Sequence, residues 1–153
     1  MTGTTAHDEH RGSLDLGACT CANLRRATRV VTQAYDRALS PMGIRATQFT
    51  VLATLAETGE VPLTRLAEAL VMDRTTLTRN LKPLIARGLV GDQQDDDQRV
   101  RKIHLTDSGA QLFLEARARW EEVQARMVEG LGPERWSGLL DGLGATVGVA
   151  RGG

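Results

Sequence analysis

The chain has 153 residues, of which 41% are hydrophobic and 3% aromatic, and its 19 Lys and Arg residues balance its 19 Asp and Glu residues. This length fits one domain, or one compact domain with a dimerisation extension. No apolar run approaches the roughly 18 residues of a membrane span, the first residues lack the apolar stretch of a signal peptide, and two cysteines make no disulfide scaffold. Composition thus argues against a secreted or membrane-spanning protein and favours a cytoplasmic one.

Although the net charge is zero, the charges are unevenly distributed. Residues 74–91 contain four basic residues and no acidic residue, whereas the acids collect at residues 92–97 and in the C-terminal third. A local basic face can bind phosphate while the whole molecule stays neutral. The charge balance therefore permits nucleic-acid binding without arguing for it.

The first part of the chain predicts a polar tail and then two helices. Residues 1–17 are polar and are expected to form a flexible tail. Apolar residues recur at helical spacing over residues 23–39, and Ser40-Pro41-Met42-Gly43 ends that helix because Pro cannot donate and Gly accepts a left-handed turn. A second helix is expected to begin after Thr47, its N-cap, and to end before Gly59.

A third and a fourth helix follow, separated by a tight break. The third is expected over residues 63–70, and the break at residues 71–73 leads to a fourth that Asp73 caps and Gly88 closes. Pro83 lies inside the fourth helix, where it removes one hydrogen bond and is expected to kink the last turns.

Two short strands are expected next, over residues 89–91 and 100–105, and an acidic turn of residues 92–98 joins them. In the second strand Ile103 and Leu105 alternate with polar residues, which indicates one buried face.

The remaining chain predicts two helices with an apolar seam. The first begins at Thr106-Asp107-Ser108, and Gly132-Pro133 separates it from the second. Steps of three and four residues connect the apolar positions, which are Leu112, Ala116, Trp120, Val123, Met127 and Leu131, then Trp136, Leu140, Leu143 and Val147. Such a seam is typical of helices that pack on a helical partner.

This order of helices followed by a two-stranded ribbon is typical of a winged helix-turn-helix. Opposite its leucines, the fourth helix presents side chains suited to base edges and phosphates, namely Arg74, Thr75, Thr76, Thr78, Arg79 and Lys82. The ribbon tip carries Asp97 and Arg99, with Arg101 following, and an arginine at a hairpin tip suits a narrow minor groove. The sequence thus predicts a DNA-binding surface.

At these residues the chain resembles the MarR family of transcription regulators. The similarity is carried by the stretch from Leu66-Ala67 to Arg79 and by Asp97-x-Arg99 leading into Leu105-Thr106-x-x-Gly109. One departure is Val71, which stands where many helix-turn-helix turns have Gly. The resemblance implies a mainly α-helical homodimer in which the first helix and the last two helices interlock. It also implies a pseudo-palindromic operator and repression relieved by a small molecule or an oxidant.

The resemblance also implies roles for single residues and for segments. Arg99 would enter the minor groove and Asp97 would orient it, while Thr75, Thr76, Thr78 and Arg79 would face the major groove. On this interpretation residues 1–17 form the tail, residues 18–46 and 106–150 dimerise, and residues 47–105 form the DNA-binding lobe.

Two cysteines near the first helix suggest a sensing function. By resemblance to the organic-hydroperoxide sensors of the family, Cys21 falls at the reactive cysteine and Tyr35 at a tyrosine that hydrogen-bonds the thiolate across the dimer. Two further tyrosines of those sensors are Arg25 and Ala46 here, so the match is partial. A helix N-terminus beside arginines favours the thiolate, and Cys19 could resolve an oxidised Cys21.

Other interpretations of the cysteines stay open. Both thiols could simply pack near a dimer contact, or they could capture a metal or metalloid with His7 and His10, although the spacing is no standard signature. A small aromatic acid is an equally compatible effector. No cofactor is predicted.

Two other classes of protein fit the sequence less well. A glycine-rich phosphate loop, a recognisable carboxylate pair, HExxH and Cys-x-x-Cys are all missing, so an enzyme is not expected. A helical dimer that binds only protein partners would use the apolar seam but would leave Arg99 and the threonine-rich helix unexplained.

Overall fold

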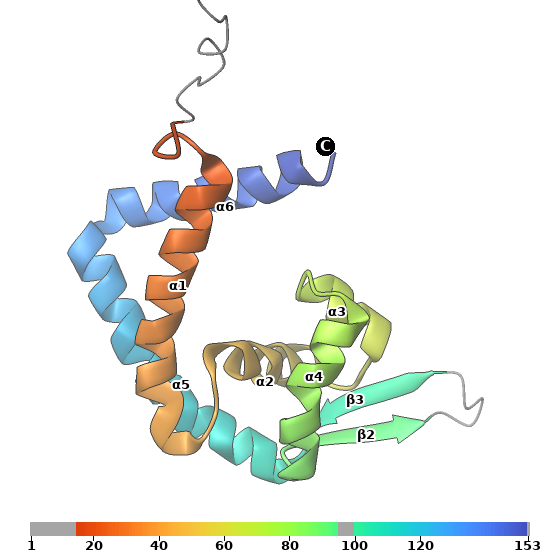
Figure 1. Cartoon of the computed structure of the whole chain (residues 1–153). Coiled ribbons are helices and arrows are strands. Elements are labelled where there is room, and N and C mark those ends of the chain that lie inside the picture. Colours follow the sequence, from red (N-terminus) through yellow and green to blue (C-terminus); the bar gives the residue numbers. More distant parts are fainter. Residues whose placement is uncertain (1–14, 95–99, 153) are drawn as a thin grey trace, which may run out of the picture. The chain divides into compact units, whose positions relative to one another are not determined.

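The structure is a computed structural model that describes residues 15–94 and 100–152 (Figure 1). The chain divides into two compact units, residues 1–33 and 34–153. The described residues are mainly helical and form, in chain order, α1 (Thr20–Leu39), a 3-10 turn (Ser40–Met42), α2 (Ala46–Thr58), β1 (Val61–Pro62), α3 (Leu63–Ala69), α4 (Arg74–Ala86), β2 (Val90–Gln94), β3 (Arg101–Leu105), α5 (Asp107–Leu131) and α6 (Pro133–Ala150).

Helix α1 begins three residues before the predicted start. The Asn23 side chain donates to the carbonyl oxygens of Gly17, at 2.7 Å, and Cys19, at 3.0 Å, and so bridges the chain ahead of the helix to its first turn. Cys21 therefore lies in the first turn of α1. At the other end, Gly43 adopts φ +66° and ends the 3-10 turn, as its position after Pro41 predicts.

The predicted N-cap of α2 was wrong, because the cap is Arg45 and Thr47 lies inside the first turn. The side chain of Gln48 accepts a hydrogen bond from the Arg45 N–H at 2.9 Å, and Asp36 Oδ1 accepts one from the Ala46 N–H at 2.7 Å. These two side chains satisfy N–H groups that a helix start leaves without partners, so the helix begins two residues earlier than an N-cap at Thr47 would place it.

The α3–α4 turn and the start of α4 follow the prediction closely. Val71 takes φ +54° in the turn. Asp73 caps α4 by accepting the Thr76 N–H at 2.8 Å, and the helix continues through Pro83 to Ala86. Gly88 ends this segment with φ +69°. The helix-turn-helix geometry thus comes from short-range features that the sequence displays.

The sheet differs from the prediction in two respects. Its strand order is β1-β3-β2 with antiparallel pairing, so the short β1 strand adds a third strand that the sequence analysis missed. Strand β2 also continues to Gln94 instead of ending at Gly91, because residues 90–94 pair in unbroken register with residues 101–105. The segment from Asp92 to Gln94, expected in the acidic turn, is therefore strand.

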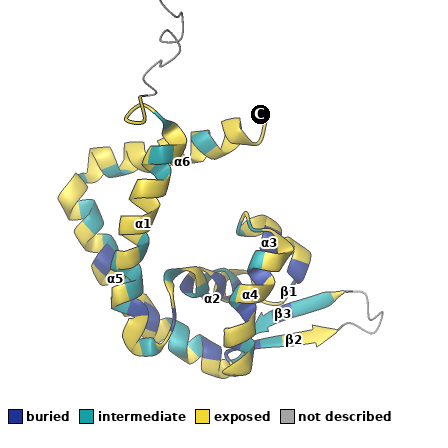
Figure 2. Ribbon diagram, viewed as in Figure 1, coloured by how far each residue is buried: buried dark blue, intermediate teal, exposed yellow. Residues whose placement is uncertain are grey.

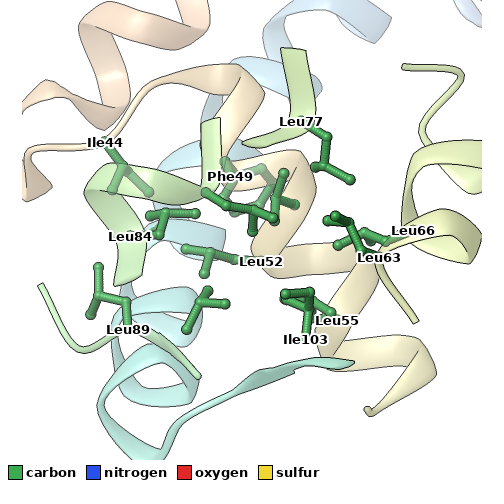
Figure 3. Close-up of a cluster of buried hydrophobic side chains, with 14 of the residues drawn as sticks. Ile44, Phe49, Leu52, Leu55, Leu63, Leu66, Leu77, Leu84, Leu89 and Ile103 are labelled. Atoms are coloured by element: carbon green, nitrogen blue, oxygen red, sulfur yellow. The ribbon is translucent and has the colours of Figure 1, made fainter. Parts of the chain in front are cut away.

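A buried core holds the helix-turn-helix together (Figure 3). The side chains come from α2, α3, α4 and β3, and those with no more than 1% exposure include Leu52, Leu55, Leu66, Leu77, Leu84 and Ile103. Burying one such side chain is worth about 1.5–3 kcal/mol, so this cluster fixes α4 against the body of the lobe.

The two C-terminal helices differ in how far they are covered (Figure 2). In α5, Ala116 and Val123 are buried and Trp120 is half-buried, so part of the predicted seam packs within the chain. Helix α6 has no buried residue, and Leu140 and Leu143 are 47% and 37% exposed.

Candidate DNA-binding surface

Helix α4 separates its residues into a packing face and an open face. Leu77, Leu81 and Leu84 recur at steps of four and three and are fully buried. The opposite side exposes five of the predicted DNA-contacting residues, namely Arg74, Thr75, Thr78, Arg79 and Lys82. The helix is therefore anchored by its leucines and presents cationic and hydroxyl groups to the outside.

These five residues line one open hollow of about 420 Å³. Arg101, at the start of β3, and Leu63, at the start of α3, complete its wall. The hollow thus brings α4 together with the first residue of β3, which pairs with Gln94 at the end of β2. The sequence could place these elements near each other only by analogy. Four cationic side chains and two hydroxyl groups therefore line one hollow, and such a surface attracts anions.

The basic side chains that α4 contributes to the hollow have no acidic partner within the described part of the chain. Arg74, Arg79 and Lys82 form no ion pair with any described residue. Arg87, the fourth base of this segment, behaves differently because its guanidinium donates to the carbonyl oxygens of Gly43, at 2.8 Å, and Met42, at 3.0 Å. Arg87 therefore ties the end of α4 to the 3-10 turn.

Thr76 is not among the residues that line the hollow. Its hydroxyl donates to Asp73 Oδ2 at 2.6 Å, and its N–H donates to Asp73 Oδ1. Both hydrogen bonds lower the pKa of Asp73 because they stabilise the carboxylate. Thr76 thus takes part in the cap of α4, whereas Thr75 and Thr78 keep their side chains in the hollow.

Arg101 is held by an acid that the sequence analysis did not single out. Its Nε and Nη2 atoms lie 2.7 Å and 2.6 Å from Asp92 Oδ2, across the β2–β3 pair. Asp92 was expected in the acidic turn of residues 92–98. Its contact with Arg101 depends on the strand register and has no local signal in the sequence. Asp97 and Arg99, the predicted hairpin-tip residues, lie outside the described residues.

The predicted sensing residues are found on α1 or just before it. Cys21 is exposed and Cys19 is half-buried. The Tyr35 hydroxyl donates to Gln124 Oε1 of α5 at 2.7 Å, and its ring lies 6.3 Å from that of Trp120. Burial raises the pKa of Tyr35.

Residues 15–94 and 100–152 contain no group of three His, Cys, Asp or Glu side chains that could hold a metal ion, while His7 and His10 lie outside them. Within the same ranges, none of the helices has the length and apolar character needed to cross a membrane.

Helix α4 on a helix-turn-helix scaffold, beside an antiparallel hairpin, defines the winged helix-turn-helix class of DNA-binding proteins. A model of the MarR family matches residues 44–100. MosR, a transcriptional regulator of M. tuberculosis solved in complex with DNA, is 37% identical with a TM-score of 0.76, covering 87% of this chain and 98% of that one.

Two other relatives are similar over most of the chain. CouR, a transcriptional repressor of Rhodococcus jostii RHA1 solved on a 23-mer DNA duplex, is 25% identical with a TM-score of 0.79, covering 86% of this chain and 94% of its own. CouR has also been solved bound to p-coumaroyl-CoA. YwoH of Bacillus subtilis (strain 168), an uncharacterized HTH-type transcriptional regulator, is 26% identical over 106 residues, 69% of this chain and 72% of YwoH.

The chain belongs to the MarR family of DNA-binding transcription regulators, which are not enzymes. The family and the fold class expected from the sequence are thereby confirmed.

Proposed function

We propose that the chain is a homodimeric repressor that binds a pseudo-palindromic operator and is released from it by a small ligand or an oxidant. The observation that carries the DNA-binding mode is the open hollow, in which Arg74, Arg79 and Lys82 lack acidic partners among the described residues. Helix α4 lies in the major groove, and the wing, with Arg99 at its tip and Asp97 orienting it, lies in the adjacent minor groove.

Homodimerisation is supported by the apolar residues that α6 leaves exposed, including Leu140 and Leu143. A second copy of α6 and its neighbouring helices would cover this face and place two copies of α4 about 34–36 Å apart, one turn of DNA. Repression is supported by CouR, a relative described as a transcriptional repressor. A protein that acts on chromosomal DNA in this way belongs in the cytoplasm.

The test is selection of duplexes from a random DNA library, followed by affinity measurements over a range of salt concentrations. Arg79→Ala is expected to lose about 1–3 kcal/mol of discrimination against altered bases. Arg99→Ala is expected to weaken binding and to reduce the salt slope by about one unit. Arg151→Ala, which removes the exposed arginine at the C-cap of α6, is the charge-matched control and should change neither. Failure of the wild-type chain to select any duplex would refute the proposal.

A small aromatic ligand is the first candidate effector. A hollow of about 460 Å³ between α2 and α5 is lined in part by Phe49, Phe113 and Trp120. The Phe49 ring lies 5.6 Å from that of Phe113 and 5.8 Å from that of Trp120, so the hollow offers an aromatic wall. The complex of CouR with p-coumaroyl-CoA supports a ligand of this kind. Release of the bound duplex by p-coumaroyl-CoA or by simple aromatic acids would identify it.

An oxidant is the second candidate effector, and the exposure of Cys21 in the first turn of α1 favours it. A hydroperoxide would oxidise the Cys21 thiolate to a sulfenic acid and be reduced to the alcohol. Cys19 would then form a disulfide with Cys21 and release water, and an added thiol would reduce this disulfide to restore both thiols. We expect peroxide to release the duplex reversibly from the wild-type protein and not from Cys21→Ser. If both proteins release the duplex at the same dose, Cys21 is not the sensor.

A further inference from the structure

The ion pair of Asp92 and Arg101 joins the two strands of the wing, which is the β2–β3 hairpin. Arg101 lines one hollow with residues of α4, the recognition helix. Both Nε and Nη2 of Arg101 approach a single oxygen, Asp92 Oδ2, at 2.7 Å and 2.6 Å. The side chains are 33% and 26% exposed, so water screens this pair less than the exposed pairs on α5. The hydrogen bond from Arg101 to Asp92 raises the pKa of Arg101.

The strand register explains how the two side chains meet. Asp92 lies opposite Ile103, and Arg101, two residues before Ile103, lies opposite the neutral Gln94. Alternation along a strand places Arg101, Ile103 and the diagonal neighbour Asp92 on one face of the sheet. Since Ile103 is fully buried in the core, this face is the one turned toward the helices.

Asp92 leaves Arg101 able to bind a second anion. A guanidinium has five N–H donors, and Asp92 receives two of them. The remaining donors lie on a side chain that lines the hollow with Arg79 and Lys82. Because the carboxylate of Asp92 already restricts the Arg101 side chain, Arg101 loses less conformational entropy when it binds DNA.

The position of Arg101 indicates which part of DNA it meets. A recognition helix in a major groove and a wing in the next minor groove are separated by one sugar-phosphate backbone. Arg101 begins β3 of the wing and lines one hollow with residues of α4, so its guanidinium is placed to meet that backbone rather than a base edge. Phosphate contacts of this kind set the register of a protein on the duplex.

We propose that Asp92 is a positioning residue that holds the guanidinium of Arg101 over the hollow, so that Arg101 binds the backbone phosphate between the two grooves. This inference rests on the proposed mode of DNA binding. Asp92 acts through Arg101 and does not touch DNA.

Two simpler roles for Asp92 make different predictions. If Asp92 only repels phosphate, its removal tightens DNA binding whether or not Arg101 is present. If the pair only holds β2 and β3 together, its removal lowers thermal stability and affects every DNA sequence and every salt concentration alike.

The first experiment measures the position of Arg101 without DNA, by NMR of arginine Nε–H groups in the full chain. The Arg101 signal is expected to exchange slowly with water in the wild type and in Asp92→Glu, and quickly in Asp92→Asn. Glu60→Gln is the matched control, because it removes the carboxylate 3.7 Å from Lys102, the residue next to Arg101 on β3, and should leave the signal unchanged. A slowly exchanging signal in Asp92→Asn would overturn the positioning role.

The second experiment is a double-mutant cycle on a duplex selected by the wild-type chain, with melting curves to show that each variant is folded. Arg101→Gln is expected to weaken binding about 5- to 20-fold and to reduce the salt slope by about one unit. Asp92→Asn is expected to weaken binding about 3- to 10-fold in the wild-type background and not at all in Arg101→Gln. Asp92→Glu is expected to restore much of the loss.

Each alternative result has a distinct meaning. Tighter binding by Asp92→Asn in both backgrounds, or unchanged binding by Arg101→Gln, overturns this inference while wild-type DNA binding stands. If the wild-type chain selects no duplex, the proposed function fails as well, and Arg101 has no phosphate to bind.

Discussion

Val71 occupies the turn between α3 and α4 with φ +54°, a left-handed conformation that costs an L-residue about 1–2 kcal/mol. Its side chain is 60% exposed, so little burial offsets that cost. We expect Val71→Gly to raise the free energy of unfolding by about 0.5–1 kcal/mol, after allowing for the greater freedom of Gly in the unfolded chain. Thermal or denaturant unfolding measures this change.

Gly88 provides the opposite substitution in the same lobe. It has φ +69°, and nothing lies within 4 Å of the position of an added Cβ, so Gly88→Ala changes backbone strain without a clash. This variant is expected to lose about 1 kcal/mol of stability. Stabilisation by Gly88→Ala, or destabilisation by Val71→Gly, would contradict the strain assigned to these turns.

Asp73 makes the start of α4 sensitive to acid. The hydrogen bonds from Thr76 lower its folded-state pKa, so the ionised cap stabilises the fold above the unfolded pKa of about 4 and loses this effect as the pH falls through the lower folded value. Asp73→Asn keeps an N-cap side chain but cannot titrate. We therefore expect the stability gap between wild type and Asp73→Asn to be present at pH 7 and to shrink below about pH 4. Melting curves across this range check it, and a gap independent of pH would exclude the effect.

At the scale of elements, the start of α5 is fitted closely to the end of the α4–β2 connection. Thr106 caps α5 by accepting the Gly109 N–H at 3.0 Å and donates its own hydroxyl to the Gly88 carbonyl at 2.6 Å. A Cβ added at Gly109 would lie 1.9 Å from the Leu89 carbonyl oxygen. Gly109→Ala is therefore expected to lose at least about 2 kcal/mol of stability, because backbone on both sides must move apart.

Gly130, near the end of the same helix, is the control for Gly109. An added Cβ there meets nothing within 4 Å, and Ala is the better helix former. Gly130→Ala should therefore leave the free energy of unfolding unchanged or raise it by up to about 1 kcal/mol. If Gly109→Ala and Gly130→Ala changed the free energy of unfolding equally, the close approach of Gly109 to the Leu89 carbonyl oxygen would not be what makes Gly109→Ala destabilising.

The elements that the sequence predicted well are those with local signals. Helix α4 was recognisable from Asp73 as a cap, from its leucines at 77, 81 and 84, and from Gly88 beyond its end, all within 16 residues. The start of α2 was misplaced because Asp36, ten residues before Ala46, supplies the hydrogen bond. Strand β1 was missed because two residues carry no alternation, and their partners in β3 lie 42 and 40 residues further along the chain.

For the whole molecule, the exposed leucines of α6 lead to a prediction about assembly. We expect the wild type to sediment as a dimer and the double variant Leu140→Glu, Leu143→Glu to sediment as a monomer, because buried charge opposes the proposed interface. The double variant should also lose operator affinity steeply, since one lobe reaches only one half-site. Sedimentation velocity and the binding assay measure both effects.

Leu114→Glu is the control for assembly, since Leu114 is a 60% exposed leucine of α5 outside the predicted seam. It should remain dimeric and bind DNA normally. A monomeric wild type, or a dimeric double variant with normal binding, would show that α6 does not form the interface.

The sequence by itself determined the order of the helices, the capped and leucine-backed α4, and the set of cationic and hydroxyl groups on its open face. These features depend on periodicity and on caps, which act within a few residues. Only the tertiary structure decided that Arg101 joins this face, that Asp92 holds it, and that Arg87 secures the 3-10 turn. Those outcomes depend on strand register and on contacts up to 45 residues apart, which neighbouring residues in the sequence do not encode.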